Sequence, residues 1–164
     1  MTDLHVRPAR TEELSDIGAL TVAAYTADGL DPASGYVTVL ADAATRARDA
    51  VLLVAVDPEG TCLGTVTVAR HGTPYAERCR QGEVEFRMLA VAPAARRRGV
   101  AEALVRTVLR TARDEGAHTV VMSSKPSMTT AHRLYHRLGF TRTPDRDWEV
   151  FPGLTLVTFA LGLG

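Results

Sequence analysis

The feature of this sequence that most constrains its fold is a strand, a short turn and a helix that follow one another within residues 83–113. An apolar-rich run over 83–91 ends just before Pro93, a residue that interrupts regular structure. From Gly99 onward, apolar residues recur every three or four positions while arginines occupy the other side, which is typical of an amphipathic helix. We therefore predict a strand over 83–91 joined by a tight turn to a helix over 99–113.

The rest of the chain alternates apolar runs, turn residues and segments of helical periodicity, without an internal repeat or a linker. We expect further strands at 4–7, 51–56, 62–69, 120–124, 140–142 and 154–161, and further helices at 11–25, 36–48 and 129–138. Strands that first form a hairpin and then alternate with helices predict an α/β fold, specifically a mixed α+β sheet. A length of 164 residues with 46% hydrophobic residues fits one domain spanning residues 1–164.

Composition excludes several classes of function. Lys plus Arg equals Asp plus Glu at 19 each, so no bulk charge draws the chain to nucleic acid or to a membrane. The charge is uneven, with a net −5 over residues 1–95 and +5 over 96–164, for which solvated faces are the simpler explanation. The two cysteines are too few for a disulfide framework, and the N-terminus has no apolar region typical of a signal peptide. The longest apolar run, residues 50–56, is far too short for a membrane span. We expect a cytoplasmic protein that binds neither nucleic acid nor membrane.

The turn between the predicted strand and helix has the composition of an anion-binding loop. It places Arg96, Arg97, Arg98 and Gly99 at the start of the helix. The first N–H groups of a helix have no internal partner and lie at the positive end of the helix dipole. A glycine there lets phosphate oxygens approach the backbone, and arginines add positive charge. The loop has neither the Gly-Lys-Ser/Thr of a Walker motif nor the glycines of a dinucleotide fingerprint. Taken alone, such a cluster of arginines is more often a solvated turn than a phosphate site.

A second motif lies about 30 residues downstream, after another predicted strand. Residues 131–140 read Ala-His-Arg-Leu-Tyr-His-Arg-Leu-Gly-Phe, and the first motif reads Arg96-x-x-Gly99-x-Ala101. Together they resemble the GNAT superfamily of N-acetyltransferases, whose patterns are Gln/Arg-x-x-Gly-x-Gly/Ala and Ala-x-x-Leu-Tyr-x-x-x-Gly-Phe. The resemblance covers residues 83–140 and has two departures. Arg97 stands where the family often has Gly, and Met128 stands where an Asn often precedes the tyrosine helix.

The resemblance implies a GNAT-like fold with a mostly antiparallel sheet and helices on both faces. It also implies direct transfer of acetyl from acetyl-CoA, a co-substrate, to a primary amine of a small molecule or peptide, without metal or covalent enzyme intermediate. The main chain of Leu89, Ala90 and Val91 would hold the pantetheine arm. The backbone amides of the loop would hold the pyrophosphate; these belong to Arg96, Arg97, Arg98, Gly99, Val100 and Ala101. Tyr135 would protonate the leaving thiolate, and Glu85 would deprotonate the amine.

The chemistry asks for these residue types. An amine with a pKa near 10 is mostly protonated at neutral pH and must lose a proton before it attacks, whereas a thiol with a pKa of about 8.5 leaves with less help. We therefore expect the tyrosine to matter less than the base. Alternatives remain open: Glu85 could pair with Arg87 on the same strand face, Glu83 or a water chain could be the base, and Tyr135 could be a core residue.

Other reactive residues are weaker candidates. His132 and His136 are four residues apart and could share a metal on one helix face, but no third ligand is evident, so we expect no metal site. Ser123 and Ser124 have no acid–base partner at a recognisable spacing. Trp148 is interpreted as a core anchor for the last strand.

The acceptor is the least constrained part of the prediction. In the GNAT fold it enters opposite the cofactor, where this chain supplies Asp28, Asp31, Tyr36, Asp145, Asp147 and Trp148. The carboxylates would attract a cationic amine, unless they only cap turns. A non-catalytic acyl-CoA-binding sensor is the alternative function, and nucleic-acid binding through the arginines ranks below it. The oligomeric state stays open, a homodimer included.

Overall fold

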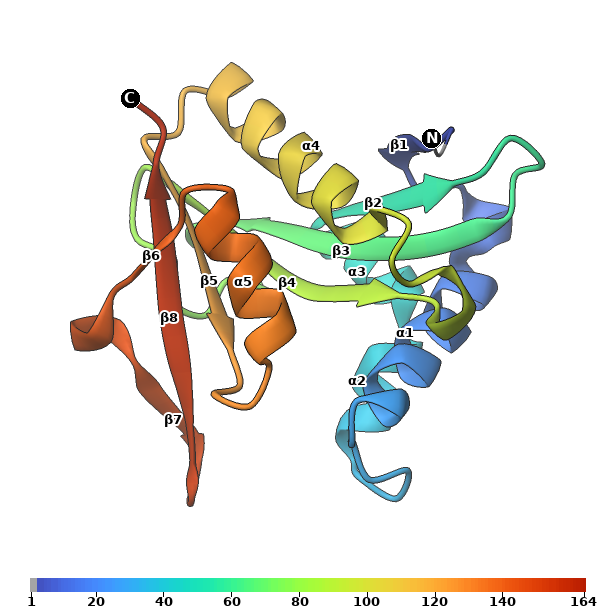
Figure 1. Ribbon diagram of the computed structural model, residues 1–164, viewed down its shortest axis with the longest axis horizontal. Helices are drawn as coiled ribbons and strands as arrows, with labels where there is room; N and C mark the ends of the chain where they lie inside the picture. Colours follow the sequence, from blue (N-terminus) through green and yellow to red (C-terminus); the bar gives the residue numbers. More distant parts are fainter. Residues whose placement is uncertain (1–2) are drawn as a thin grey trace.

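The structure is a computed structural model that describes residues 3–164, and its strands form one open eight-stranded sheet (Figure 1). The strand order is β1-β2-β3-β4-β5-β8-β6, with β7 paired to the N-terminal part of β8. Neighbouring strands are antiparallel except β4 and β5, which are parallel, so the sheet is mostly antiparallel as predicted. The strands are β1 His5–Pro8, β2 Val51–Val56, β3 Cys62–Arg70, β4 Glu83–Val91, β5 Thr119–Ser124, β6 Thr141–Arg142, β7 Trp148–Phe151 and β8 Leu154–Gly162.

Helices cover both faces of the sheet, which confirms the predicted architecture. On one face, Leu104 and Val108 of α4 and Tyr135 of α5 pack on Val66 and Phe86. On the other face, α1 and α3 pack on the alternate residues of β2. The helices are α1 Leu14–Ala27, α2 Tyr36–Ala41, α3 Ala43–Asp49, α4 Val100–Asp114 and α5 Thr129–Arg137, with 3-10 turns at Thr11–Glu13, Pro93–Ala95 and Pro144–Arg146. Within the described part of the chain, none of these helices has the length and apolar character needed to cross a membrane.

The predicted single helix over 36–48 is wrong, because the segment forms two helices that break at Asp42. Asp42 has φ −87° and ψ 70°, outside the helical region, and its side chain caps α3 by accepting a hydrogen bond from Thr45 N. The fully buried Arg46 donates to the carbonyl oxygen of Val39 at 2.9 Å, near the end of α2. A capping aspartate therefore starts a new helix within a run that otherwise has the pattern of one helix.

The strand β7 was not expected from the sequence. It is four residues long and mostly exposed, and it forms a hairpin with β8 around the turn at Pro152 and Gly153. Such a short edge strand has too little alternation of apolar and polar residues to be recognised. Its position matters, because it places Trp148 beside β5.

Candidate active site

The sheet opens between β4 and β5. Their parallel pairing covers only Glu83–Glu85 against Thr119–Val121, and beyond these residues the two strands separate (Figure 1). A bulge in β4 accompanies the separation: the register with β3 shifts between Thr65 and Thr67, and Met88 has φ 55°. A bulge bends its strand and changes the direction of the residues that follow. The result is a gap in the middle of the sheet.

Main-chain groups of β4 face this gap. Ala92 N donates to Leu63 O of the β3 side at 2.9 Å, and Ala90 lies opposite Thr65 in the same register. Since alternate residues of a strand direct their N–H and C=O groups to opposite neighbours, those of Leu89 and Val91 face the side that β5 has left. These are the main-chain groups that the resemblance assigned to the pantetheine arm, and the structure leaves them without a strand partner within residues 3–164.

The predicted anion-binding loop follows directly. Gly99 precedes α4 with φ 75°, and no side chain caps the helix. Within the described residues, the N–H groups of Val100, Ala101 and Glu102 have no hydrogen-bond partner. A Cβ added at Gly99 would meet no protein atom within 4 Å, so packing within the chain does not explain this glycine. Its left-handed backbone does, and the open space would admit an anion.

The three arginines of the loop differ in their roles. Arg96 forms an ion pair with Asp28 at 2.8 Å and also donates to Ala24 O, which ties the loop to the end of α1. Arg97 and Arg98 are exposed and form no ion pair with a described residue. Arg97 has φ 65°, a conformation that favours glycine, the residue that the resemblance leads us to expect at this position.

Glu85 is buried, with 1% of its surface exposed, and it faces away from α5. Its neighbour Phe86 contacts the Tyr135 ring, so Glu85 points to the opposite face of the sheet. Its Oε1 accepts hydrogen bonds from three successive amides, those of Glu77, Arg78 and Cys79, at 2.8, 3.0 and 3.1 Å. Its Oε2 accepts no hydrogen bond from residues 3–164, so one carboxylate oxygen stays available for a proton.

The partners of Glu85 and Glu83 bear on two of the alternatives that the sequence left open. Arg87 pairs with Glu77 at 2.9 Å and not with Glu85. Glu83 is buried and accepts two hydrogen bonds from Arg146, at 3.0 and 2.8 Å. Burial acts to raise the pKa of Glu83, but the hydrogen bonds from Arg146 and from Arg80 N hold this pKa below its ordinary value. Glu83 is therefore a structural ion pair and a poor base.

Tyr135 is a residue of α5 and lies on the other face of the sheet. Its ring packs against Phe86, Phe140 and Phe159, with centroids 5.7–6.0 Å away. The residue is 4% exposed, and its hydroxyl has no hydrogen-bond partner among the described residues. Burial raises the pKa of this hydroxyl, so it stays protonated at neutral pH. Tyr135 is thus both a core residue and an unpaired proton donor.

Two serines at the end of β5 have partners that sequence spacing did not reveal. Ser124 Oγ lies 3.0 Å from His132 Nε2, and Trp148 Nε1 donates to Ser123 Oγ at 3.0 Å. Burial lowers the pKa of His132, which favours the neutral ring.

No described group of three or more His, Cys, Asp or Glu side chains could hold a metal. Trp148 is half-buried and turned toward β5; the sequence suggested a core anchor and also a place at the acceptor entrance.

The carboxylates expected at the acceptor entrance mostly have other partners. Asp28 pairs with Arg96, and Asp147 pairs with Arg142 and accepts a hydrogen bond from Thr158 N. Asp31 accepts from Ala33 N, in the turn-capping role considered as the alternative. These contacts remove most of the electrostatic argument for a cationic acceptor.

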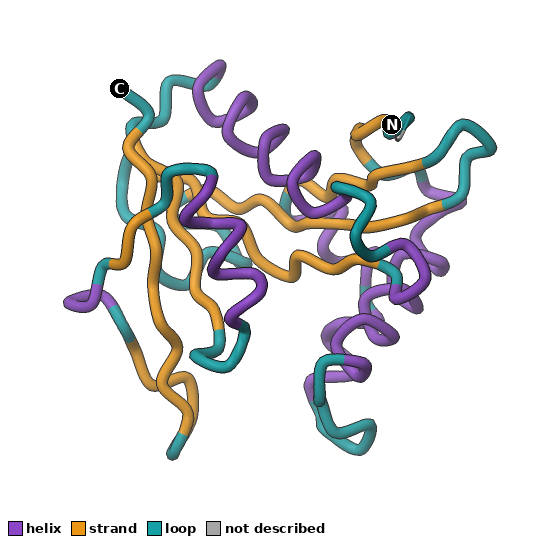
Figure 2. Tube along the Cα trace, in the orientation of Figure 1, coloured by secondary structure: helices purple, strands orange, loops and turns teal. Residues whose placement is uncertain are grey.

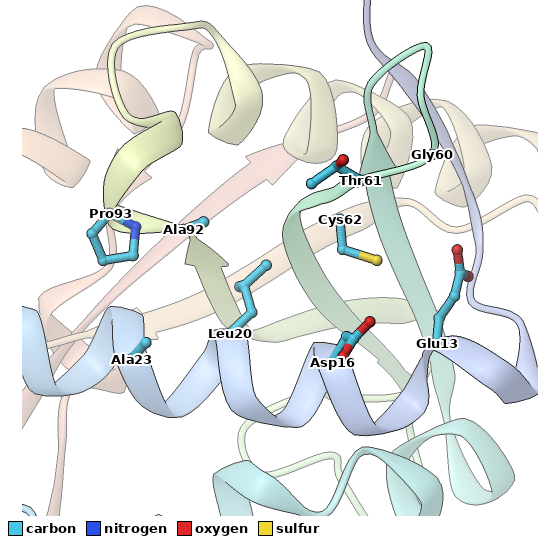
Figure 3. Close-up of a pocket in the computed structure, with 9 residues that line it drawn as sticks. All are labelled: Glu13, Asp16, Leu20, Ala23, Gly60, Thr61, Cys62, Ala92 and Pro93. Carbon is cyan, nitrogen blue, oxygen red and sulfur yellow. The ribbon is translucent and has the colours of Figure 1, made fainter.

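A separate groove of about 400 Å³ lies between α1, the turn before β3 and the end of β4 (Figure 3). Asp16 and Leu20 of α1 face Cys62 across it. Burial, followed by the charges of Glu13 and Asp16, raises the pKa of the Cys62 thiol, so a thiolate nucleophile is disfavoured there. None of the predicted catalytic or cofactor-binding residues lines this groove.

Comparisons with known proteins agree with this arrangement. The model of the "Acetyltransferase (GNAT) family" matches residues 16–140. The aminoglycoside N(6')-acetyltransferase type 1 of Klebsiella aerogenes is 35% identical over 96 residues, which are 58% of this chain and 62% of that protein. The mycothiol acetyltransferase of Arthrobacter sp. is 37% identical over 118 residues, 68% of this chain and 35% of that protein. The chain therefore spans between about a third and three fifths of these curated relatives.

Solved structures share the fold over nearly the whole chain. A GCN5-related N-acetyltransferase from Kribbella flavida has a TM-score of 0.72 and 25% identity, covering 98% of both chains. A GNAT family acetyltransferase from Brucella melitensis, solved in complex with acetyl-CoA, has a TM-score of 0.67 and 21% identity, covering 100% of this chain and 90% of that one.

Proposed function

Because this chain belongs to the GNAT family of acetyltransferases, we propose that it transfers the acetyl group of acetyl-CoA directly to a primary amine of a small molecule or peptide. The observation that carries the proposal is the gap between β4 and β5. Glu85 lies on one face of the sheet at this gap and Tyr135 on the other. A thioester held in the gap would have a base on the acceptor side and a proton donor on the cofactor side.

The chain supplies a complete route for the cofactor. The unpartnered amides at the start of α4 fit a pyrophosphate, and the main chain of Leu89 and Val91 fits the amides of a pantetheine arm. These groups follow one another from the start of α4 back along β4. They lead toward Glu85 and Tyr135, which are buried on opposite faces of the sheet. Acetyl-CoA would supply the activated acetyl group.

The residues then have distinct tasks in the reaction. Glu85 Oε2 takes a proton from the acceptor ammonium, and the free amine attacks the acetyl carbonyl carbon. A C–N bond forms, the nitrogen loses its second proton to solvent, the C–S bond breaks, and the leaving thiolate receives a proton from solvent or from Tyr135. Exchange with solvent then removes the proton from Glu85 and restores that of Tyr135. Because the pKa of Tyr135 is raised, its proton is held tightly and its help is modest.

Calorimetry with acetyl-CoA tests the cofactor site. Gly99→Asp introduces a carboxylate where the phosphate would lie and should abolish binding by repulsion. Gly116→Asp is a matched control, because Gly116 also has a positive φ (81°) with no neighbour around a Cβ, but it lies at the other end of α4. We expect the control to bind acetyl-CoA as the wild-type protein does. Equal binding by both variants would contradict the placement of the pyrophosphate.

A second measurement separates catalysis from sensing. Release of free thiol from acetyl-CoA, with the mass of the acetylated amine, would be followed over a panel of amines. A non-catalytic acyl-CoA sensor would bind acetyl-CoA but release no thiol with any amine.

A further inference from the structure

Arg87, Arg146, Arg46 and Arg78 lie on the side of the sheet that Glu85 faces, and the first three have evident partners. Arg87 pairs with Glu77 at 2.9 Å, and Arg146 pairs with Glu83 at 2.8 Å. The fully buried Arg46 donates to main-chain oxygens of the α2–α3 segment. Arg46 also lacks an ion pair and a partner for its Nε, but both of its terminal nitrogens donate hydrogen bonds. The fourth, Arg78, forms no ion pair with any residue in the range 3–164, and only one of its terminal nitrogens donates.

Only some of the N–H donors of the Arg78 guanidinium have hydrogen-bond partners. It lies 5.3 Å from the centre of the Trp148 ring, and its Nη2 donates to Arg146 O at 3.2 Å. Its Nε is buried without a hydrogen-bond partner, and its Nη1 has none among the described residues. A partly buried cation with free donors is costly unless an anion completes it.

The position of Arg78 connects it to the proposed base. Its own amide nitrogen donates to Glu85 Oε1 at 3.0 Å. Glu85 lies beside Val121 in the register of β4 and β5, and Ser123, two residues further on, points to the same face. Trp148 Nε1 bonds to Ser123 Oγ, which leaves the Ser123 hydroxyl proton free for another acceptor. Arg78, Trp148 and Ser123 are therefore connected to one another on the side of the sheet that Glu85 faces.

Resting on the proposed function, we propose that the acceptor carries a carboxylate beside its amine, as a free amino acid does, and that Arg78 binds this carboxylate. The amine would then lie at Glu85 while the carboxylate meets the Arg78 guanidinium and the Ser123 hydroxyl. Trp148 packs against the guanidinium, whose planar fork of N–H donors matches the two oxygens of a carboxylate. The ion pairs of Asp28 and Asp147 agree with this assignment, because arginines neutralise two of the four carboxylates expected at the acceptor entrance.

Matched triplets of acceptors test the proposal. Each triplet contains an amino acid, its carboxamide and its decarboxylated amine, for example phenylalanine, phenylalaninamide and phenethylamine. Charge-assisted hydrogen bonds favour the acid, so kcat/KM for the best acid should exceed that for its amide and its amine by about 10- to 100-fold. A peptide with an acidic N-terminal residue is also tested, because its carboxylate lies on the side chain. It distinguishes recognition of the α-carboxylate of a free amino acid from recognition of a side-chain carboxylate.

Variants then show whether Arg78 is responsible. Arg78→Gln should raise KM for the acids about 10- to 100-fold and leave kcat/KM for the amides almost unchanged, whereas a purely structural role would lower kcat for every member. Arg78→Lys should recover part of the selectivity. Arg80→Gln is the matched control, because the Arg80 side chain is exposed and has no hydrogen bond to the described residues.

The outcomes distinguish this proposal from the one on which it rests. Acetylation of amides or amines as efficient as that of the acids, no turnover of any acid, or selectivity unchanged in Arg78→Gln each overturns the assignment of Arg78. Failure of the wild-type protein to bind acetyl-CoA overturns the proposed acetyl transfer itself.

Discussion

Glu83 and Glu85 are two residues apart on one face of β4, yet their surroundings give them different chemistry. Glu83 is neutralised by Arg146, a residue 63 positions away in the sequence. Glu85 is held by amides of the loop before β4, and no side chain of residues 3–164 bonds to its second oxygen. The distinction depends on partners, so only the structure separates the two carboxylates.

Replacement of Glu85 by glutamine tests its role as base. Glu85→Gln should lower kcat at neutral pH by about 10²–10⁴-fold, because the amide cannot accept the proton. Activity should recover at alkaline pH, where free amine is abundant. Tyr135→Phe should cost less at every pH. The measurement is the pH dependence of kcat/KM for both variants. Full activity of Glu85→Gln at neutral pH would mean that solvent, and not Glu85, takes the proton from the acceptor amine.

A second residue-scale prediction concerns acid stability. Two hydrogen bonds from Arg7, at 2.8 and 2.7 Å, lower the pKa of Glu13 from 4.5 to about 2 despite the opposing effect of burial. Since the folded-state pKa lies below the unfolded one, this stability is present above about pH 4.5 and is lost as the pH falls toward 2. Glu13→Gln should therefore cost about 1.5–2 kcal/mol at pH 7 and much less at pH 2.5.

Urea unfolding at the two pH values measures the difference. Glu12→Gln is the control, because Glu12 is an exposed neighbour without an ion pair in the described structure. An equal cost of Glu13→Gln at both pH values would contradict the role of the carboxylate.

At the scale of elements, the close contact between α4 and the sheet depends on Gly64 of β3. A Cβ at this position would lie 2.7 Å from Val100 Cγ1 and 3.0 Å from Ala90 O. Gly64→Ala should therefore push the start of α4 away from β4, costing about 1–3 kcal/mol and weakening acetyl-CoA binding. Gly162→Ala in β8 has open space around its Cβ and should change neither quantity. Chemical denaturation and calorimetry measure both effects, and indistinguishable variants would refute the packing argument.

The loop before α4 gives another prediction at this scale. Arg97 adopts φ 65°, a conformation that costs a non-glycine residue about 1–2 kcal/mol. Arg97→Gly should remove this strain and, after the added freedom of the unfolded chain, stabilise the fold by roughly 0.5 kcal/mol. Loss of the charge should raise the acetyl-CoA Kd only a few-fold. Arg98→Gly, at a residue without positive φ, should not stabilise the protein; a gain equal to that of Arg97→Gly would argue against strain.

The elements differ in how far the sequence predicts them. The dense apolar periodicity of α4 and the apolar runs of β2 and β3 identify these elements from the amino-acid sequence alone. The break at Asp42 and the short strand β7 are decided by specific contacts, namely the cap on Thr45 and the pairing with β8. The pattern of apolar and polar residues carries no information about such contacts.

At the scale of the whole molecule, the site depends on an interruption of the sheet. The parallel pair of β4 and β5 separates, and Figure 2 shows the strands continuing on either side of the opening with loops at its ends. The two motifs predicted the residues on β4, on the α4 loop and on α5. They could not predict that Arg78, Ser123 and Trp148 meet beside Glu85, because these three residues come from a loop, β5 and β7.

We propose that the opening between β4 and β5 holds the acetyl thioester between Glu85 and Tyr135. A crystal structure of the wild-type protein with acetyl-CoA would show this position. We expect the pyrophosphate on the amides of residues 96–101, the pantetheine arm on the main chain of Leu89 and Val91, and the thioester in the opening with Tyr135 beside the sulfur. Acetyl-CoA bound elsewhere, for example in the groove beside Cys62, or a thioester remote from both Glu85 and Tyr135, would contradict it.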